Sequence, residues 1–572
     1  MAGGAQTRRR APLSLLPEVL GGLARRLLSP LRVFWRRGWL YRRLLKGKLT
    51  DHIVFYPYDA SSRRLEDADA LLRGRFRFAG ETLDVVEGSV FEKPAPSNEW
   101  ARELHSFAWL PPLSAAGGEA ARTLATNLIA QWVRRNQRYS EPAWEPAIAA
   151  RRLINLFAHG RIALANSDVL WRSKLFVSLR EQARLLARTS KEAPAGLPRL
   201  EAATAFALSG ACLDDPKRLQ SGLNRLQEEI AEQILPDGGH ISRSPEALVH
   251  AYRLVVMVGD ALTAIGQDVP QALRSAHDRM APMVRFFRHG DGGMALFNGA
   301  SECEPKMIAG LLARDEVRGQ PFVFAPHSGY QRLVAGRVLA LLDCGAPPQS
   351  NYSSDAHAGC LAFEFSSGAQ RVVVNCGAAS DNKGEWEDAM RATAAHSTVT
   401  LDDTSMASIL APGFVRNALG ARLLGGPKHV TTNRMETSHG WTAEASHDGY
   451  QALFGITHER VMTLAPHGTS LTGRDRLVPQ AKRHRSDQIT FSVRFHIHPE
   501  VRVSTAQSGD VLLKLPNGDG WRFRCGGGTL SIEESVYLGT GSVRRTEQLV
   551  VTGTVKDEPA EIAWIFEQIG TS

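Results

Sequence analysis

Hydrophobic residues recur every three or four positions through the first half of the chain, which is the period of a helix with one buried face. Between residues 120 and 137 the apolar positions are Leu124, Leu128, Ile129, Trp132 and Val133. The spacing returns over residues 144–165, 171–188, 199–212, 216–235, 245–265 and 271–288, with Gly, Pro and Asp in the gaps. Because no strict repeat links these segments, the pattern predicts a helical barrel or solenoid rather than a regular repeat array.

The pattern changes after about residue 315 to short runs rich in β-branched and aromatic residues. These runs fall at residues 323–324, 330–334, 337–342, 360–365, 371–375, 397–401, 456–464, 468–477, 488–497, 511–515, 521–524, 529–534 and 547–552. Gly, Asn, Asp and Ser bound them, as in Ser366-Ser-Gly368. Many short strands without helices between them predict a β-sandwich. The expected fold class is therefore a multidomain α+β protein, with helices over residues 51–315 and the sandwich over residues 316–572.

Composition places the chain among globular proteins, and charge singles out its first 50 residues. Hydrophobic residues make up 43% and charged residues 22% of the 572 positions. The net charge is +9, but residues 1–50 hold twelve Lys or Arg against the single acid Glu18, so the remaining body is close to neutral. The net positive charge is confined to this N-terminal arm, which argues against a nucleic-acid-binding fold.

The arm mixes its arginines with leucines and with Trp35 and Trp39. It contains no apolar run of the roughly 18 residues that a transmembrane helix needs, and no compact signal-peptide core with a small-residue cleavage site. One interpretation is a basic amphipathic helix that lies on an anionic membrane surface. The other is a solvated helix that docks on the protein's own body.

Four segments together carry a family resemblance. They read Asp237-Gly-Gly-His240 followed by Ser244-Pro245; His357-Ala-Gly-Cys-Leu-Ala-Phe-Glu364 running on to Asn375; Arg391-Ala-Thr-Ala-Ala-His396; and His447-Asp-Gly-Tyr450. In this order and spacing they resemble the heparinase II/III-like polysaccharide lyases, over roughly residues 100–560. The resemblance implies an incomplete α/α toroid followed by an antiparallel β-sandwich.

The resemblance also implies a reaction on acidic polysaccharides. Such lyases cleave next to a uronic acid by β-elimination: a base removes the C5 proton, a second group neutralises the sugar carboxylate, and an acid protonates the leaving oxygen. By similarity, His396, His240 and Tyr450 are the candidates for proton transfer. Arg199 and Arg243 are candidate neutralisers, since guanidinium groups bind carboxylates in a bidentate manner. Trp144 is a candidate sugar contact, with a place in the core as the alternative.

Relatives carry an Asn-His pair and a tyrosine that this sequence lacks at the matching places. Gly196-Leu-Pro-Arg199 stands where the pair is expected, and Glu246-Ala247 follows Ser244-Pro245 where the tyrosine is expected. Some relatives hold a structural zinc with a histidine at the place of His357 and an acid at the place of Asn375. A neutral amide is a poor zinc ligand, so no metal is predicted, with His357 and Asn375 as weak candidates.

Two functions from different classes follow. The first is a lyase acting on a uronate-containing polysaccharide in the bacterial cell envelope or periplasm. The second is a catalytically silent polysaccharide-binding or envelope-assembly protein that retains the fold. A hydrolase with paired carboxylates is weaker, because the spacing of Glu145, Asp237 and Glu246 is not diagnostic. The histidine motifs have a purely structural alternative as well, in which His357 and His447 cap turns.

Overall fold

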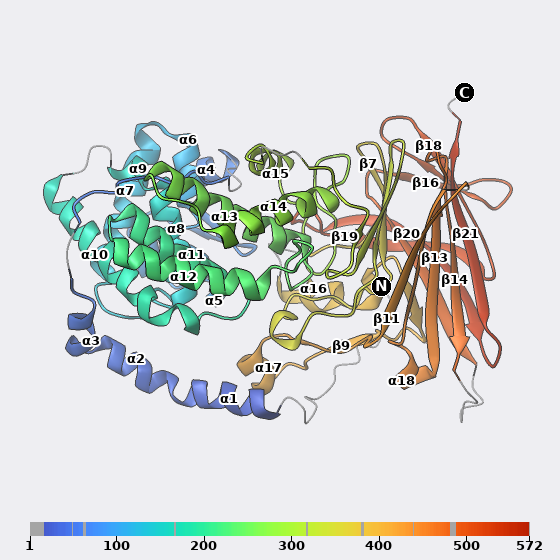
Figure 1. The fold of residues 1–572 in the computed structure, drawn as a ribbon, viewed down its shortest axis with the longest axis horizontal. Helices are drawn as coiled ribbons and strands as arrows, with labels where there is room; N and C mark the ends of the chain where they lie inside the picture. The colour runs from blue at the N-terminus through green and yellow to red at the C-terminus, as the bar shows by residue number, and fades with distance from the viewer. Residues whose placement is uncertain are drawn as a thin grey trace.

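A computed structural model describes residues 16–47, 50–60, 65–164, 168–315, 319–378, 383–438, 440–480 and 488–570. It consists of a helical domain and a β-sandwich, with a helical arm that runs along both (Figure 1). The arm comprises α1 (Leu16–Leu27), α2 (Ser29–Arg37) and α3 (Trp39–Leu44). The predicted segment 1–50 lies partly outside the described residues.

The helical domain is the predicted toroid. Its helices are α4 (Leu65–Leu72), α5 (Asn98–His105), α6 (Leu110–Ala116), α7 (Gly118–Arg135), α8 (Pro146–His159), α9 (Arg161–Leu164), α10 (Val169–Thr189), α11 (Leu197–Cys212), α12 (Pro216–Gln233), α13 (Pro245–Ala264), α14 (Gln271–Phe286) and α15 (Pro305–Leu312). A hairpin of β1 (Arg75–Phe78) and β2 (Glu81–Asp84) follows α4. The long helices match the predicted segments within a few residues, whereas α4, α5, α6, α15 and the hairpin are too short to give a clear period.

Central helices of the toroid are apolar because they are surrounded by protein. In α11 the positions from Ala202 to Cys212 are all buried. Within the described residues only α13 is long and apolar enough to cross a membrane, and 67% of that stretch is buried inside the molecule. Such burial is expected of a core helix whose apolar residues continue around its whole circumference.

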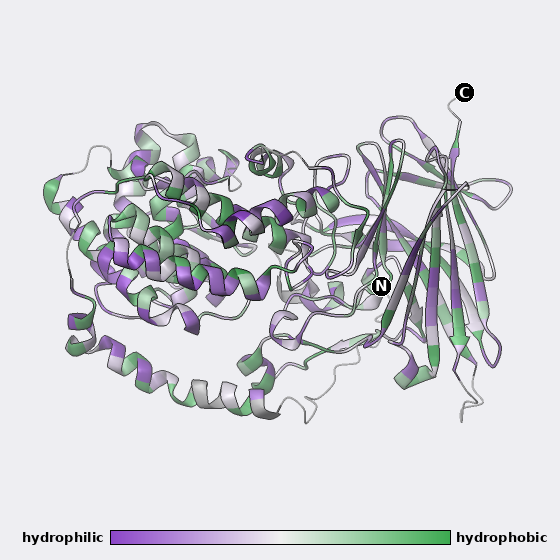
Figure 2. Cartoon of the chain, viewed as in Figure 1, coloured by the Kyte–Doolittle hydropathy of each residue, from purple (hydrophilic) through white to green (hydrophobic). Residues whose placement is uncertain are grey.

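The second domain is an antiparallel sandwich. Its nine-stranded sheet follows the order β19-β20-β15-β7-β6-β5-β4-β3, with β8 beside β15, and its eight-stranded sheet follows β11-β12-β13-β14-β21-β18-β17-β16. The strands are β3 (Phe324–Ala325), β4 (Tyr330–Ala335), β5 (Val338–Asp343), β6 (Phe363–Ser367), β7 (Gln370–Val374), β8 (Val399–Leu401), β11 (Val430–Thr437), β12 (Gly440–His447), β13 (Ile456–Leu464), β14 (Ser470–Pro479), β15 (Ile489–Ile497), β16 (Arg502–Thr505), β17 (Val511–Lys514), β18 (Gly520–Gly526), β19 (Thr529–Tyr537), β20 (Arg544–Val555) and β21 (Ala560–Ile569). Many strands alternate apolar and polar residues, so that one face packs between the sheets (Figure 2).

Three short helices interrupt the strands, contrary to the expectation of none. They are α16 (Lys383–Met390), α17 (Phe414–Leu419) and α18 (Gln451–Phe454), and a small ladder of β9 (Ala407–Ile409) and β10 (Leu423–Gly425) lies near α17. The predicted class, a toroid followed by an antiparallel sandwich, is nevertheless confirmed. The predicted boundary near residue 315 falls between the end of α15 at Leu312 and the start of β3 at Phe324.

Candidate functional site

A cleft of about 870 Å³ lies where the toroid meets the sandwich. One wall comes from α4, the β1–β2 hairpin, α8, α11 and α13, and the other from the segment 301–307 and the loop 539–541 between β19 and β20. Its polar lining consists of Glu66, Asp67, Arg75, Arg77, Arg151, Asn155, Glu201, Glu246, His250, Arg253, Ser301, Glu302, Glu304 and Thr540. Clefts between domains collect polar groups from both sides, so this is the candidate ligand site.

Three of the cleft's arginines, Arg75, Arg151 and Arg253, are paired with acids. Arg151 makes two hydrogen bonds to Glu103, of 2.6 and 3.0 Å. Arg253 donates to Asp59 at 2.7 Å, and Arg75 donates to Asp84 at 2.9 Å. Since six carboxylates also line the cleft, the cavity is not the basic groove that steers a polyanion.

One imidazole and one carboxylate share a wall of the cleft on α13. Glu246 accepts a hydrogen bond of 2.8 Å from the backbone N–H of Ser301, and His250 Nε2 lies 3.7 Å from Glu246 Oε1. Burial opposes ionisation, but the contact with His250 and the bond from Ser301 lower the pKa of Glu246 overall. A partly exposed imidazole beside a carboxylate has the geometry of a candidate general base. Sequence reasoning missed His250, although its spacing of four residues from Glu246 on a helix was a usable signal.

His396 and His357 form a buried pair at the edge of the sandwich. His357 Nδ1 lies 3.2 Å from His396 Nε2, and the rings stack at 5.1 Å. Burial lowers the pKa of His396 to about 4, and burial together with the neighbouring His396 lowers the pKa of His357 still further. Their side chains are 3% and 6% exposed and neither lines the described cleft. The predicted catalytic role of His396 therefore has no support from solvent access.

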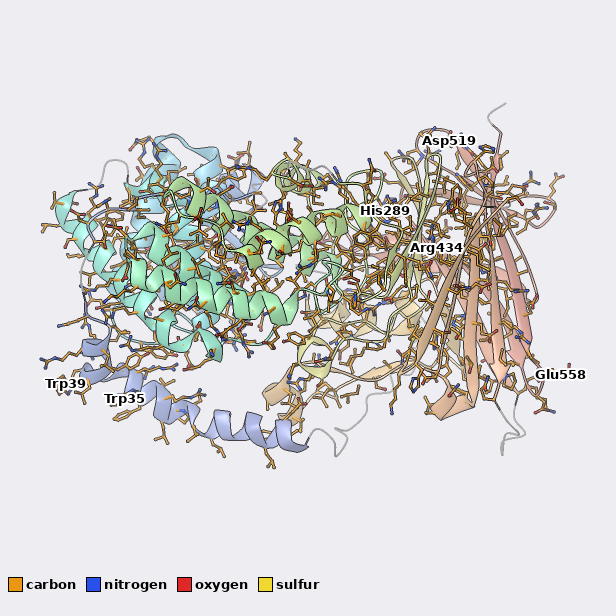
Figure 3. All side chains as sticks on the ribbon, viewed as in Figure 1. Trp35, Trp39, His289, Arg434, Asp519 and Glu558 are labelled. Carbon is orange, nitrogen blue, oxygen red and sulfur yellow. The ribbon has the colours of Figure 1, made fainter. Side chains whose placement is uncertain are left out.

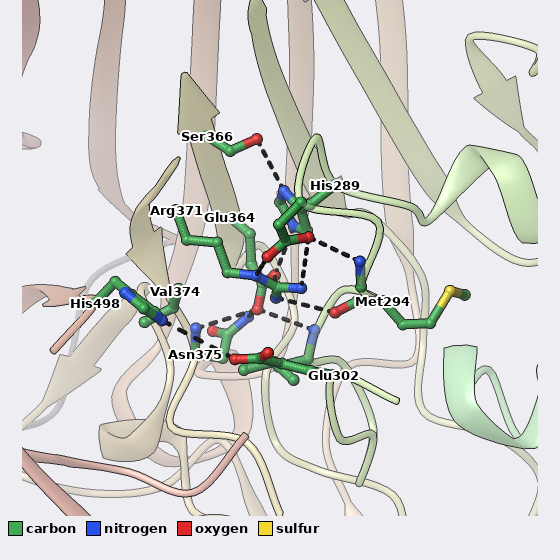
Figure 4. A network of polar contacts seen from close by, with 12 residues as sticks. His289, Met294, Glu302, Glu364, Ser366, Arg371, Val374, Asn375 and His498 are labelled. Atoms are coloured by element: carbon green, nitrogen blue, oxygen red, sulfur yellow. Dashed lines mark hydrogen bonds and ion pairs between the residues drawn. The ribbon is translucent and has the colours of Figure 1, made fainter. Parts of the chain in front are cut away.

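Asn375 belongs to a hydrogen-bond network at the domain junction rather than to a metal site (Figure 4). Its amide nitrogen donates to Glu364 at 3.1 Å, and its amide oxygen accepts from the Ser397 N–H at 3.1 Å. Glu364 also accepts from His289 at 2.9 Å. Burial opposes the charge of Glu364, but the His289 bond and the charge of Arg371 lower its pKa. Among the described residues no group of three or more His, Cys, Asp or Glu is arranged to hold a metal, and the Asn375 amide is fully engaged, so the implied zinc does not fit.

His240 is held in the turn that follows α12. Its Nδ1 lies 2.7 Å from Ser242 Oγ, and its Nε2 lies 3.2 Å from the side-chain oxygen of Gln233. Burial lowers the pKa of His240 to about 4. Both ring nitrogens are used inside the protein, so the turn geometry accounts for this histidine without a substrate.

The two predicted carboxylate neutralisers also have other partners. Arg243 forms a buried ion pair with Asp343, donates to Ser328 O at 2.8 Å, and lies over the Tyr330 ring at 4.8 Å. It thereby joins the toroid to the start of the sandwich. Arg199, at the start of α11, is partly exposed and donates to Ala193 O at 3.2 Å. Neither residue lines the described cleft.

Tyr450 and Trp144 lie in the two hydrophobic cores. Tyr450 is fully buried and its hydroxyl donates to Val399 O at 2.7 Å, and burial raises its pKa well above the usual range. Trp144 is 2% exposed, and its indole N–H donates to Asn136 O at 3.1 Å. This burial gives no support to the roles predicted for Tyr450 as a proton donor and Trp144 as a sugar contact, and it agrees with the core alternative for Trp144.

Comparisons with known proteins agree with the fold and the resemblance. The profile of the family "Heparinase II/III-like, C-terminal" matches residues 317–565. FtsZ-localized protein C of Caulobacter vibrioides (strain NA1000 / CB15N) is 33% identical over 519 residues, which are 89% of this chain and 89% of that protein.

Solved structures of lyases share the whole architecture. A crystal structure of heparinase III is similar with a TM-score of 0.68 at 15% identity, covering 93% of this chain and 89% of its own. The heparan sulfate lyase HepC of Pedobacter heparinus, as a mutant, gives a TM-score of 0.59 at 16% identity, covering 89% and 83%. At such identity the likeness concerns the fold. The relative in Caulobacter, the matching family profile and the shared fold agree. The chain belongs to the heparinase II/III-like family.

Proposed function

We propose that this chain is a glycan-binding protein with a polysaccharide-lyase fold, which serves envelope assembly at the bacterial division site and does not cleave uronate polymers. The name of its relative, FtsZ-localized protein C, supports the place of action. The fold supports a glycan ligand, since the similar structures include a heparan sulfate lyase. The assignment concerns the cleft between the toroid and the sandwich.

The observation that carries this proposal is the separation of the predicted catalytic groups from the cleft. β-Elimination requires a base, a carboxylate neutraliser and an acid around one sugar residue. His396, His240 and Tyr450 are buried and hydrogen-bonded within the protein. No tyrosine is among the described residues that line the cleft, so the acid that relatives use has no counterpart there.

The charge of the cleft favours a neutral or amine-bearing glycan over the acidic polysaccharide that the sequence suggested. Its carboxylates include Glu201 and Glu302, while Arg151 and Arg253 are paired with acids behind the wall. A polyuronate entering this cavity would meet like charges, while Arg75, Arg151 and Arg253 are each already paired with an acid. Such an approach costs free energy in a partly buried site.

A second candidate function is a lyase whose proton-transfer groups lie at other positions than the sequence suggested. Asn155 on α8 and the Glu246–His250 pair on α13 line one cleft. In that case an amide would polarise the sugar carboxylate and His250 would be the base. This candidate needs the cleft to accept a uronate despite its acidic lining.

One experiment separates the two candidates. The purified protein is incubated with heparan-type, alginate, hyaluronate, glucuronan, neutral and amino-sugar polymers, while the ultraviolet absorbance of unsaturated uronate and the bound polymer are both measured. We expect no absorbance rise with any polymer, and retention of a neutral or amine-bearing polymer that Glu201→Gln weakens. Glu119→Gln, at an exposed carboxylate on α7, is the matched control. An absorbance rise abolished by His250→Ala would overturn the proposal in favour of the lyase.

A further inference from the structure

The N-terminal arm is attached to both domains by one of its faces. On α1, Val19 packs against the small cluster of Leu410, Leu419 and Leu424 beside α17, and Glu18 forms an ion pair with Arg422. On α2, Arg36 pairs with Glu192 at 2.5 Å and Val33 packs on the toroid core. Tyr41 and Leu45 are buried there as well. The arm is thus a strap from the sandwich to the toroid (Figure 1).

The outer face of this strap is apolar and open to solvent. Nine of the twenty-one exposed large hydrophobic side chains in the described part of the chain lie between residues 20 and 44. They are Leu20, Leu27, Leu28, Leu31, Phe34, Trp35, Trp39, Leu40 and Leu44. Phe34 is 80% and Trp39 is 70% exposed, and Figure 3 labels Trp35 and Trp39 on the side of the arm away from the toroid. A concentration of exposed apolar side chains in one segment marks an interaction surface, whereas single exposed residues do not.

The charge around the patch identifies its partner. Arg37, Arg42, Arg43 and Lys46 are exposed beside these apolar side chains, and the sequence has no acidic residue between Glu18 and Asp51. Leucine, phenylalanine and tryptophan with flanking basic groups are typical of helices that lie in the interface of an anionic bilayer. The three helices follow one another along one edge of the molecule (Figure 1).

We propose that the outer face of the strap docks on an anionic lipid surface while its inner face stays attached to the toroid and the sandwich. The arm therefore acts as a rigid platform that sets the orientation of both domains on the membrane, rather than as a tether that swings free. This inference does not depend on the glycan chemistry of the cleft.

Vesicle co-sedimentation tests the surface. We expect the full chain to sediment with vesicles of phosphatidylglycerol and phosphatidylcholine and to remain in solution with phosphatidylcholine alone. The triple variant Leu31→Ala/Phe34→Ala/Trp39→Ala should reduce the bound fraction at least tenfold. Val169→Ala/Leu170→Ala removes equally exposed apolar side chains from α10 and should leave binding unchanged. Equal vesicle binding of the triple variant and the wild-type chain would overturn the proposal. The proposal would also fail if light scattering showed that the exposed side chains drive self-association of the chain while vesicles do not bind it.

A disulfide lock tests the platform. A Cβ built at Gly22 lies 3.4 Å from the Cβ of Ala418 on α17, close to the separation in disulfides. The variant Gly22→Cys/Ala418→Cys, oxidised and checked by its gel mobility with and without reductant, should bind vesicles within twofold of the wild-type chain. Binding that is lost in the oxidised variant and restored by reductant would show that the arm must detach, which overturns the platform.

Discussion

Two buried histidine pairs of the sandwich differ in whether all their ring nitrogens have hydrogen-bond partners. In one, His447 accepts from the Gly449 N–H at 3.0 Å, its other nitrogen lies 3.3 Å from His458, and His458 reaches Asp475 at 2.7 Å. In the other, His396 Nε2 lies close to His357, and the buried His396 Nδ1 has no hydrogen-bond partner among the described residues.

The difference separates a closed structural network from an open one. The Asp475 carboxylate also accepts hydrogen bonds from Arg460 at 2.6 and 3.0 Å and from the Trp564 indole N–H at 2.8 Å. Both of its oxygens are therefore hydrogen-bonded. A buried nitrogen without a partner costs about 1–3 kcal/mol. The first pair is therefore a contributor to stability, while the second sits in a less optimal arrangement at the domain junction.

Acid should produce the largest effect, because burial holds several histidines neutral, among them His396 of the open pair and His240 in the turn after α12. Burial lowers the pKa of His396 and of His240 to about 4, against about 6.5 for an unfolded histidine. The unfolded chain binds more protons between these values, so the free energy of unfolding falls as pH drops through 6.5 toward 4. Each of these histidines contributes a loss on the order of 2 kcal/mol between pH 7 and pH 5.

Urea unfolding at pH 7 and pH 5, followed by tryptophan fluorescence, measures this loss. His240→Gln should reduce the number of protons taken up on unfolding between pH 7 and pH 5 by about one, since glutamine does not titrate. A midpoint that is the same at both pH values would mean that these histidines are protonated in the folded chain.

Asp475→Asn comes next in size. The substitution removes the charge that compensates the buried Arg460, and breaking a buried ion pair costs about 3–5 kcal/mol. Glu459→Gln is a matched control on the neighbouring strand, because Glu459 pairs with Arg476 at 3.3 Å on the surface and such pairs contribute about 0–1 kcal/mol. Similar midpoints of thermal unfolding for the two variants would contradict the closed network.

Several of these features could be predicted from the sequence and others could not. The period of apolar residues gave the toroid helices, because a long helix with a buried face leaves a clear pattern. The strand β11 was missed because none of its positions is fully buried. The strand β12 was missed although it is largely buried, because most of its residues are small or polar. The histidine motifs carried the family resemblance, but motifs do not reveal whether a side chain faces a cleft or the core.

The cleft itself depends on distant segments. Asn155, His250 and Thr540 meet there from α8, α13 and the loop before β20, and no local pattern relates them. Guanidinium chemistry made Arg243 a candidate carboxylate neutraliser, whereas its pairing with Asp343 depends on a contact across one hundred residues. Long-range packing decides such pairings, so spacing along the chain does not encode them.

Gly359→Ala probes the packing of the open pair. A Cβ at this position would lie 2.2 Å from His396 Cδ2, which is impossible without displacing the ring. Overpacking of a buried site costs about 1–3 kcal/mol. His396→Ala vacates that space, so the double variant should be less destabilised than the sum of the single ones, as measured by a double-mutant cycle of urea unfolding. Strict additivity would place the His396 ring elsewhere.

His250→Ala should have the smallest effect on stability and the clearest effect on binding. His250 is 39% exposed in its side chain and lies beside Glu246 without a short hydrogen bond, so its removal should change the free energy of unfolding by less than about 0.5 kcal/mol. Because His250 lines the cleft, the same substitution should weaken glycan binding severalfold in an affinity measurement. His447→Ala should instead lower the stability of the sandwich without altering the glycan affinity of the folded fraction. A buried histidine and a cleft histidine would then be distinguished by which property their loss changes. The reverse outcome would move the ligand site to the sandwich.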